Sequence, residues 1–250
     1  MTLKIKATMM AVMMAATGVM AQAQAAEVYT AGANMAFAPF EFVDENNQPA
    51  GFEMDLIRAI GKAQGVEIKL QNMPFDGLIP ALQTRAIDFA ISGMTITEQR
   101  ARRVLFSKPY YQSGLAVMVR EANKAKYPTI DSVKGKQLCA QIGTTGAITA
   151  RKFSGQNVKE FNSAPEAFLE LQNGGCEAVV HDKPVMDYYM ARRGSQGMYR
   201  LPEALSAEDY GIAVAKNNKK MQEFVNQGLE KVKANGEYDR IYTKWFGAQK

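Results

Sequence analysis

The chain has 250 residues and a formal net charge of +5, from 30 Lys and Arg against 25 Asp and Glu. The basic residues are scattered, and the one tight group, Arg100-Ala101-Arg102-Arg103, is typical of a solvated helix end, so nucleic-acid binding is not expected. A single histidine argues against a histidine-based metal site and against a Ser-His-Asp hydrolase.

Residues 1–25 have the pattern of a cleavable secretory signal. Lys4 and Lys6 give it a basic start, an apolar run follows over 7–20, and Ala23-Gln24-Ala25 offers the small residues that signal peptidase requires. The alternative is a membrane anchor, but the run is short for a bilayer span. Loss of Lys4 and Lys6 leaves 28 basic residues and a net charge of +3. The pattern predicts an exported protein, without a lipid anchor because no cysteine lies at the cleavage site.

Strands and helices alternate over residues 26–111, which we interpret as the first segment of one lobe. A further helix is expected to begin near Thr95, because Thr95 and Glu98 have the spacing of a capping box. Such alternation predicts βαβ units and a mainly parallel sheet. The expected elements are strands at 28–33, 41–43, 66–70 and 86–91, a helix from Gly51 that ends near Gly65, and a helix at 75–84.

The same alternation starts again in residues 112–209, which we interpret as a second lobe with a hinge strand. We interpret two extended runs, at 114–119 and 210–214, as the places where the chain passes from the first lobe to the second and returns. Residues 210–250 then belong to the first lobe and end in a helical tail broken at Asn235-Gly236. The prediction is an α/β fold of two lobes, joined by two strands, with a cleft between them. The expected elements of the second lobe are strands at 136–141, 158–161 and 177–180 and helices at 147–153 and 165–172.

Two cysteines, Cys139 and Cys176, lie at or before apolar, strand-like runs. An exported protein can form a disulfide between them, and two buried free thiols are the alternative. The sequence leaves both open.

The stretch from Ser92 to Arg100 combines a glycine, three hydroxyl side chains and an arginine near the expected start of a helix. Backbone N–H groups, hydroxyls and a guanidinium that converge at such a place favour a small carboxylate ligand. The stretch therefore predicts one wall of a carboxylate-binding site.

Several motifs, in this order and spacing, resemble the periplasmic solute-binding proteins of ABC importers for polar amino acids, and most of all the glutamine-binding members. The resemblance covers essentially the whole chain after the signal and implies a two-lobed periplasmic-binding-protein fold of type II. It also implies capture of a free amino acid and its delivery to a membrane permease. The motifs are residues 37–42, 51–56, 79–83, 95–100, 180–182 and 210–213 and the terminal Lys244-Trp245-Phe246.

An amino acid held in a closed cleft needs partners for both of its charges, because a buried unpaired charge is costly. The residues and the resemblance together assign Arg100 to the carboxylate and Asp182 to the ammonium group. The alternatives are an exposed Arg100 and an Asp182 that only caps a helix. Further donors to the carboxylate are the hydroxyls of Thr95, Thr144 and Thr145, and the backbone carbonyl of Gly93 is a further partner of the ammonium group. The rings of Phe37 and Phe75 are expected to lie on either side of the aliphatic carbons.

The expected side-chain pocket departs from the glutamine-binding relatives. Asn34 stands where they have an acid, Gln141 where they have a lysine, and Thr145 where they have a glycine. Asn34 and Gln141 each donate and accept hydrogen bonds, so they suit a neutral polar side chain. The expected ligand is glutamine, followed by asparagine. Because His181 can also donate or accept, histidine and glutamate are further alternatives.

The sequence therefore predicts a monomeric binding protein that performs no reaction and needs no metal or organic cofactor. One alternative is a dehydratase on the same scaffold, but Asn34 and Gln141 stand where a catalytic carboxylate would be useful and Asp182 is committed to an ammonium group. The other alternative is a sensor that presents the loaded protein to a receptor, or an adhesin.

Overall fold

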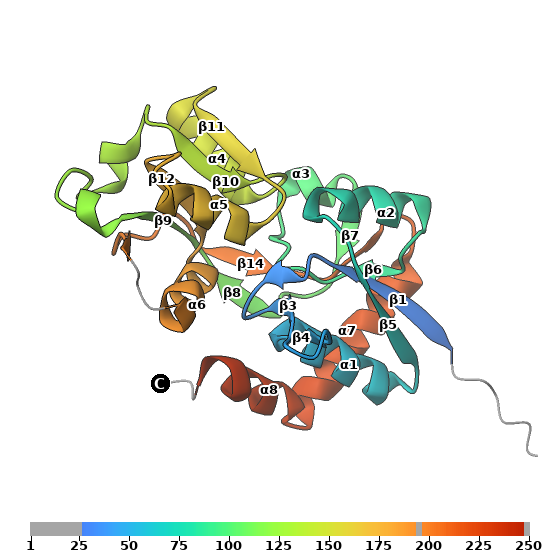
Figure 1. The fold of residues 1–250 in the computed structure, drawn as a ribbon. Coiled ribbons are helices and arrows are strands. Elements are labelled where there is room, and N and C mark those ends of the chain that lie inside the picture. The colour runs from blue at the N-terminus through green and yellow to red at the C-terminus, as the bar shows by residue number, and fades with distance from the viewer. Residues whose placement is uncertain (1–26, 194–196, 248–250) are drawn as a thin grey trace, which may run out of the picture.

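The computed structural model describes residues 27–193 and 197–247, so the predicted signal at 1–25 lies outside the described residues. Two five-stranded sheets form the centres of two lobes, which Figure 1 shows one above the other. In these ranges no helix combines the length and the apolar character needed to cross a bilayer.

The first lobe is built on a sheet with the strand order β5-β1-β6-β15-β7. Strand β1 pairs in parallel with β5 and β6, and the returning strand β15 pairs antiparallel with β6 and β7. The predicted strand at 86–91 is shorter in the structure, because the side chain of Asp88 accepts a hydrogen bond from the Thr30 amide, a group that a strand would otherwise pair. The bounds are β1 (Val28–Ala33), β5 (Glu67–Asn72), β6 (Phe89–Ala90), β7 (Val104–Phe106) and β15 (Ala213–Ala215).

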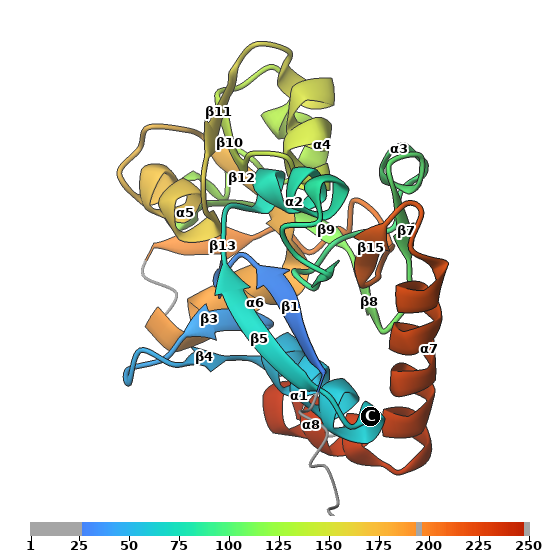
Figure 2. The ribbon, with the colours of Figure 1, turned by 90° about the vertical axis from the view of Figure 1, so that its right-hand side faces the viewer.

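Helices cover both faces of this sheet (Figure 2). The helix α1 ends at a left-handed Gly65, as predicted, and packs with the tail helices α7 and α8, which meet at the predicted break around Gly236. The shorter α2 covers the other face. The bounds are α1 (Phe52–Gln64), α2 (Leu78–Thr84), α3 (Glu98–Ala101), α7 (Lys219–Ala234) and α8 (Glu237–Phe246), with a small sheet of β2 (Ala36–Phe37), β3 (Glu41–Val43) and β4 (Pro49–Ala50) beside them.

The second lobe has a sheet with the order β11-β10-β12-β9-β13. Strand β9 alternates between two cores: Leu115 and Val117 pack with one hydrophobic cluster, and Ala116 and Met118 pack with the other. This burial on both faces explains the unbroken apolar run in the sequence. The bounds are β9 (Leu115–Arg120), β10 (Leu138–Gln141), β11 (Val158–Phe161), β12 (Ala178–Asp182), β13 (Met198–Arg200), α4 (Thr145–Ser154), α5 (Ala164–Gln172) and α6 (Lys183–Arg193).

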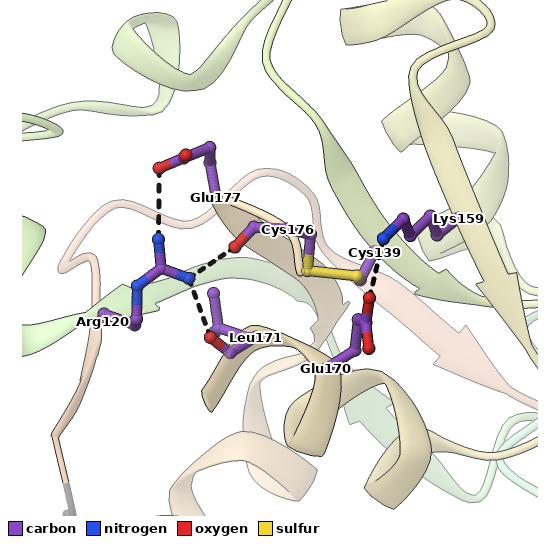
Figure 3. The surroundings of a disulfide bond; sticks show 7 residues. All are labelled: Arg120, Cys139, Lys159, Glu170, Leu171, Cys176 and Glu177. Atoms are coloured by element: carbon purple, nitrogen blue, oxygen red, sulfur yellow. Dashed lines mark hydrogen bonds and ion pairs between the residues drawn. A yellow bond between two sulfur atoms is a disulfide. The ribbon is translucent and has the colours of Figure 1, made fainter. Parts of the chain in front are cut away.

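A disulfide joins Cys139 on β10 to Cys176, just before β12 (Figure 3). Both cysteines are buried. The guanidinium of Arg120 lies beside the bridge and donates to the carbonyl oxygens of Leu171 and Cys176 at 2.9 and 2.6 Å. The bridge therefore fixes two strands that both end at the cleft.

The lobes are connected by a pair of antiparallel strands, β8 (Tyr111–Ser113) and β14 (Glu208–Tyr210), which lie between them in Figure 1. Strand β8 leads directly into β9, and β14 leads back into β15 of the first sheet. Two short crossing strands are the geometry of a hinge. The predicted architecture of two lobes joined by two strands is confirmed, but the joining strands are β8 and β14. The predicted run at 114–119 is instead β9 of the second sheet, and the run at 210–214 ends in β15 of the first.

Candidate functional site

The predicted site residues come from the facing edges of both lobes, and all are buried or half-buried. Two contacts within the group cross from one lobe to the other: Gln141 donates to Asn34 at 3.1 Å, and the rings of Phe37 and His181 lie 5.4 Å apart. Arg100 also crosses the cleft, since it donates to the carbonyl of Gly143 at 3.0 Å. The residues of the first lobe are Asn34, Phe37, Phe75, Gly93, Thr95 and Arg100, and those of the second are Gln141, Thr144, Thr145, His181 and Asp182.

The predicted capping box at Thr95 and Glu98 is wrong. Helix α3 is a single turn that begins at Glu98, and its N-cap is Thr97, whose hydroxyl accepts from the Arg100 amide at 3.2 Å. Thr95 lies before the cap and forms an isolated β-bridge with Tyr210 of β14. The Thr95 hydroxyl therefore does not cap the helix and faces the cleft, where it donates to Glu208. A helix this short adds little dipole field to the site.

Arg100 is buried, with 8% of its surface exposed, so the alternative of a solvated side chain is excluded. Its guanidinium donates to the carbonyl oxygens of Thr95 and Gly143, at 2.9 and 3.0 Å, and lies 5.3 Å from the centre of the Phe75 ring. Burial lowers the pKa of Arg100, while the negative charges of Glu208 and Asp182 oppose that shift. The guanidinium remains charged, and its N–H groups lie between the two lobes.

The two predicted threonines of the second lobe have different partners. The Thr144 hydroxyl caps α4, since it accepts from the Ala147 amide at 3.1 Å and donates to the Gln141 carbonyl at 2.7 Å. The Thr145 hydroxyl instead points across the cleft to Glu208, at 2.8 Å. Of the two side chains, only that of Thr145 is placed to meet a ligand.

Glu208 is a site residue that sequence reasoning missed. One of its carboxylate oxygens accepts from both Thr95 and Thr145, at 2.7 and 2.8 Å, and the other accepts from Ser206 at 3.3 Å. The sequence offered one indication: Glu208 comes just before the motif that starts at Tyr210, where the chain returns to the first lobe.

Asp182 ends β12 and is 4% exposed. Its carboxylate accepts from the Tyr210 hydroxyl at 2.5 Å, a partner that the sequence did not indicate. Burial raises the pKa of Asp182 to about 7; the nearby Glu208 adds to the rise, and the Tyr210 hydroxyl and Arg100 oppose it. This carboxyl group therefore titrates near neutral pH and lacks a cationic hydrogen-bond partner within the described chain.

Beyond Asp182, the uncharged side chains of His181, Gln141 and Asn34 are linked by hydrogen bonds. The Nδ1 atom of His181 accepts from the Asp182 amide at 2.7 Å, so the ring proton is on Nε2, which donates to the Gln141 side-chain oxygen at 3.3 Å. Burial lowers the pKa of His181 to about 3, so the ring is uncharged. Gln141 in turn donates to Asn34, and Asn34 donates to the Met73 carbonyl at 3.3 Å.

Gly93 lies between the site and a pair of buried acids. Its φ is +52°, and a side chain here would place a Cβ atom 2.4 Å from the Phe37 ring, so only glycine fits. The Gly93 amide donates to both carboxylate oxygens of Glu53, at 2.8 and 3.1 Å, and the Tyr110 hydroxyl donates to Glu53 at 2.5 Å. These bonds fix the peptide unit between Ser92 and Gly93 against a buried acid.

Glu41 and Glu53 have no exposed surface, and burial raises the pKa of both carboxyl groups. The Oε2 atom of Glu41 has no hydrogen-bond partner among the described residues. Burial without a cationic partner favours the form of a carboxyl group that keeps its proton. Burial and the neighbouring Glu53 raise the pKa of Glu41 far above its usual range, so Glu41 carries a proton. Ser92 links this pair to the site, since it donates to Glu41 at 2.7 Å and accepts from the Asn34 amide at 3.0 Å.

A hollow of about 300 Å³ leads from Arg100 to the surface between the lobes. Its walls include Phe75 and Asp76 of the first lobe and Gly143 and Arg151 of the second. The volume is at the lower limit of small-molecule sites. Among the described residues, no cluster of His, Cys, Asp and Glu has the arrangement needed to hold a metal ion.

Comparisons with known proteins agree with this geometry. A probable histidine-binding protein of Neisseria gonorrhoeae is 35% identical over 228 residues, which cover 89% of this chain and 84% of that protein. Two solved structures of an ancestral arginine-binding protein, one bound to arginine and one to glutamine, are 41% and 42% identical; each has a TM-score of 0.84 and covers 88% of this chain and 98% of the ancestral one.

The model of one protein family matches residues 29–248, nearly the whole described chain. The two-lobed architecture and the interlobe position of the site agree with the resemblance inferred from the sequence motifs. The chain belongs to the bacterial extracellular solute-binding proteins, family 3.

Proposed function

We propose that this chain is the periplasmic substrate-binding component of an ABC importer, which binds a free polar amino acid between its lobes and delivers it to a membrane permease. The observation that carries the proposal is that Arg100 and Asp182 come from opposite lobes and are both buried in one cleft. A guanidinium and a carboxylate so placed match the two charges that every α-amino acid presents.

The proposed binding mode assigns the ligand carboxylate to Arg100 and to the hydroxyls of Thr95 and Thr145. The ammonium group binds Asp182 and the carbonyl of Gly93. A ligand that bridges both lobes binds the closed form better than the open one, so it shifts the protein toward closure. The permease then recognises the closed outline and releases the ligand when the lobes separate.

Glutamine is our first choice of ligand. Asn34, Gln141 and neutral His181 surround the expected side-chain position with donors and acceptors but no formal charge. An amide side chain can replace the Gln141–Asn34 hydrogen bond with one bond to each residue. Asparagine, histidine and glutamate follow in this order of fit, and glutamate is the weakest because its charge would lack a partner here.

A cationic amino acid such as arginine is the second candidate. Glu208 adds a second acid to the cleft, so Asp182 and Glu208 together exceed the single charge of Arg100. This surplus negative charge favours a ligand with a net positive charge. Relatives named for arginine and histidine binding support the same class.

The test is a screen of the twenty amino acids against protein that was unfolded and refolded to remove endogenous ligand. We expect glutamine to raise the melting temperature most, and calorimetry to give one site per chain. Arginine as the strongest ligand would favour the second candidate. No shift with any amino acid, while the refolded protein melts cooperatively, would contradict the proposed function, and product formation from prephenate or arogenate would indicate the dehydratase alternative.

A further inference from the structure

Glu208 links the two lobes through a single atom. One carboxylate oxygen accepts from the hydroxyl of Thr95 in the first lobe and from that of Thr145 in the second. Hydrogen bonds to a carboxylate are about twice as strong as those between neutral groups. The residue lies on β14, one of the two strands about which the lobes would move.

The same two hydroxyls are those that the proposed function assigns to the carboxylate of the ligand. Each hydroxyl has one proton to donate, so neither can donate fully to Glu208 and to a ligand at the same time. Arg100 lies close enough for the charge of Glu208 to act on it. The carboxylate of Glu208 thus has the partners that an amino acid would use.

We propose, on the basis of the proposed function, that Glu208 is a built-in occupant of the ligand-carboxylate position. When the empty protein closes, Glu208 bridges the lobes through Thr95 and Thr145. An incoming amino acid must displace it, and the apparent affinity is reduced by the fraction of protein in which Glu208 holds that position.

The proposal predicts opposite effects for two ligands. An amino acid competes with Glu208, whereas an amine that lacks the carboxylate leaves Glu208 in place and benefits from its negative charge. Removal of that charge should therefore strengthen the binding of glutamine and weaken the binding of 4-aminobutanamide, the same molecule without its carboxylate. A residue that only stabilises the fold would change both affinities in the same direction.

The experiment compares Glu208→Gln, Glu208→Ala and the wild type by calorimetry with glutamine and with 4-aminobutanamide. The matched control is Asp209→Asn, which removes one negative charge from the next, exposed position of the same strand. We expect glutamine to bind Glu208→Gln about tenfold more tightly, because a residue that occupies its site nine-tenths of the time reduces affinity tenfold. The amine should lose affinity in both Glu208 variants, and the control should match the wild type.

Small-angle scattering of the ligand-free proteins gives a second test that needs no ligand. We expect a larger radius of gyration for Glu208→Ala than for the wild type, because the bond between the lobes is lost. Weaker glutamine binding in Glu208→Gln, or an unchanged radius in Glu208→Ala, would overturn the inference. If the wild type binds no amino acid, the proposed function fails by itself, and the scattering result still decides whether Glu208 holds the lobes together.

Discussion

The hydroxyl of Tyr210 donates a 2.5 Å hydrogen bond to the carboxylate of Asp182. Tyr210 ends the hinge strand β14, and Asp182 ends β12 of the second lobe. The bond therefore joins the hinge directly to the group that we assign to the ammonium of the ligand. Because Asp182 is buried, this hydrogen bond rather than water fixes the orientation of its carboxylate.

Tyr210→Phe removes this donor and leaves the ring in place. The Tyr210 hydroxyl opposes the rise in the pKa of Asp182, so we expect the pKa to rise further and ligand affinity at pH 7 to fall. The loss of a hydrogen bond to a charged group should cost about 1.5–3 kcal/mol of binding free energy, or roughly 10- to 150-fold. Calorimetry measures this effect. Tyr111→Phe is the control, since that ring stacks on Tyr210; equal effects of both substitutions would contradict the assignment.

Ligand binding should depend on pH through Asp182. Its pKa is raised to about 7, and the ammonium group needs the ionised form, so binding must release a proton below pH 7. We expect affinity to fall about tenfold for each pH unit below 7 and to level off above pH 8. His181, with a pKa lowered to about 3, does not titrate in this range. Calorimetry in buffers of different ionisation enthalpy detects the released proton, and a flat profile between pH 5 and 7 would exclude Asp182.

The raised pKa of Asp182 should make the stability of the ligand-free protein fall with rising pH, whereas ligand affinity rises. The folded protein holds the Asp182 proton more tightly than the unfolded chain, whose aspartates titrate at about 3.9. This contribution to stability is complete below that value and is lost as pH rises to about 7. Ligand-free Asp182→Asn should therefore lose less stability than the wild type between pH 4 and 7 in urea unfolding.

The buried pair of Glu41 and Glu53 should respond unequally to the same substitution. Glu41 carries the proton, so Glu41→Gln preserves a neutral donor and should change stability by less than about 1 kcal/mol. Glu53→Gln removes the carboxylate that accepts from Gly93 and Tyr110 and should cost about 3 kcal/mol or more. Urea unfolding at pH 7 measures both variants, and a reversed order would place the proton on Glu53.

The pair should also make stability fall as the pH rises. The pKa of Glu41 is raised in the folded state, so its contribution is present at low pH and is lost as the pH rises through the folded-state pKa. Glu41→Gln should flatten that part of the stability profile.

Arg100→Ala removes the guanidinium but no residue of either hydrophobic core. Because charge-assisted hydrogen bonds contribute about 1.5–3 kcal/mol each, the loss of two to the ligand carboxylate should weaken binding about 100-fold or more. The ligand-free melting temperature should hardly change, because the two hydrogen bonds of Arg100 go to loop carbonyls at the cleft. Arg103→Ala, which removes an exposed charge at the mouth of the hollow, is the control; an affinity within threefold of the wild type for Arg100→Ala would refute its role.

The disulfide should stabilise the second lobe. Cys139 and Cys176 are 37 residues apart, and closing a loop of that length corresponds to about 4 kcal/mol in the chain-entropy model. The double substitution Cys139→Ala and Cys176→Ala should therefore unfold at clearly lower urea concentration. A reducing agent should lower the stability of the wild type but not that of the double variant; if it lowers neither, the bridge does not form.

Much of the fold could be predicted from the sequence because it depends on local patterns. The apolar periodicity and Gly65 determine α1, and the break at Gly236 separates α7 from α8. The two extended runs indicate where the chain crosses between the lobes, although the hinge strands themselves come just before them. The motifs also led to most of the candidate site, since residues such as Arg100 and Asp182 lie at the ends of recognisable strands and turns.

The tertiary structure alone decided how the polar groups pair. The sequence placed the cap at Thr95, but Thr97 caps α3 and leaves Thr95 to meet Glu208, which lies 113 positions away in the chain. The raised pKa of Glu41 likewise depends on burial from all sides and on the neighbouring Glu53. Local patterns determine elements because they act over a few residues, whereas a hydrogen bond or a shifted pKa depends on which distant groups the packed chain brings within about 3 Å.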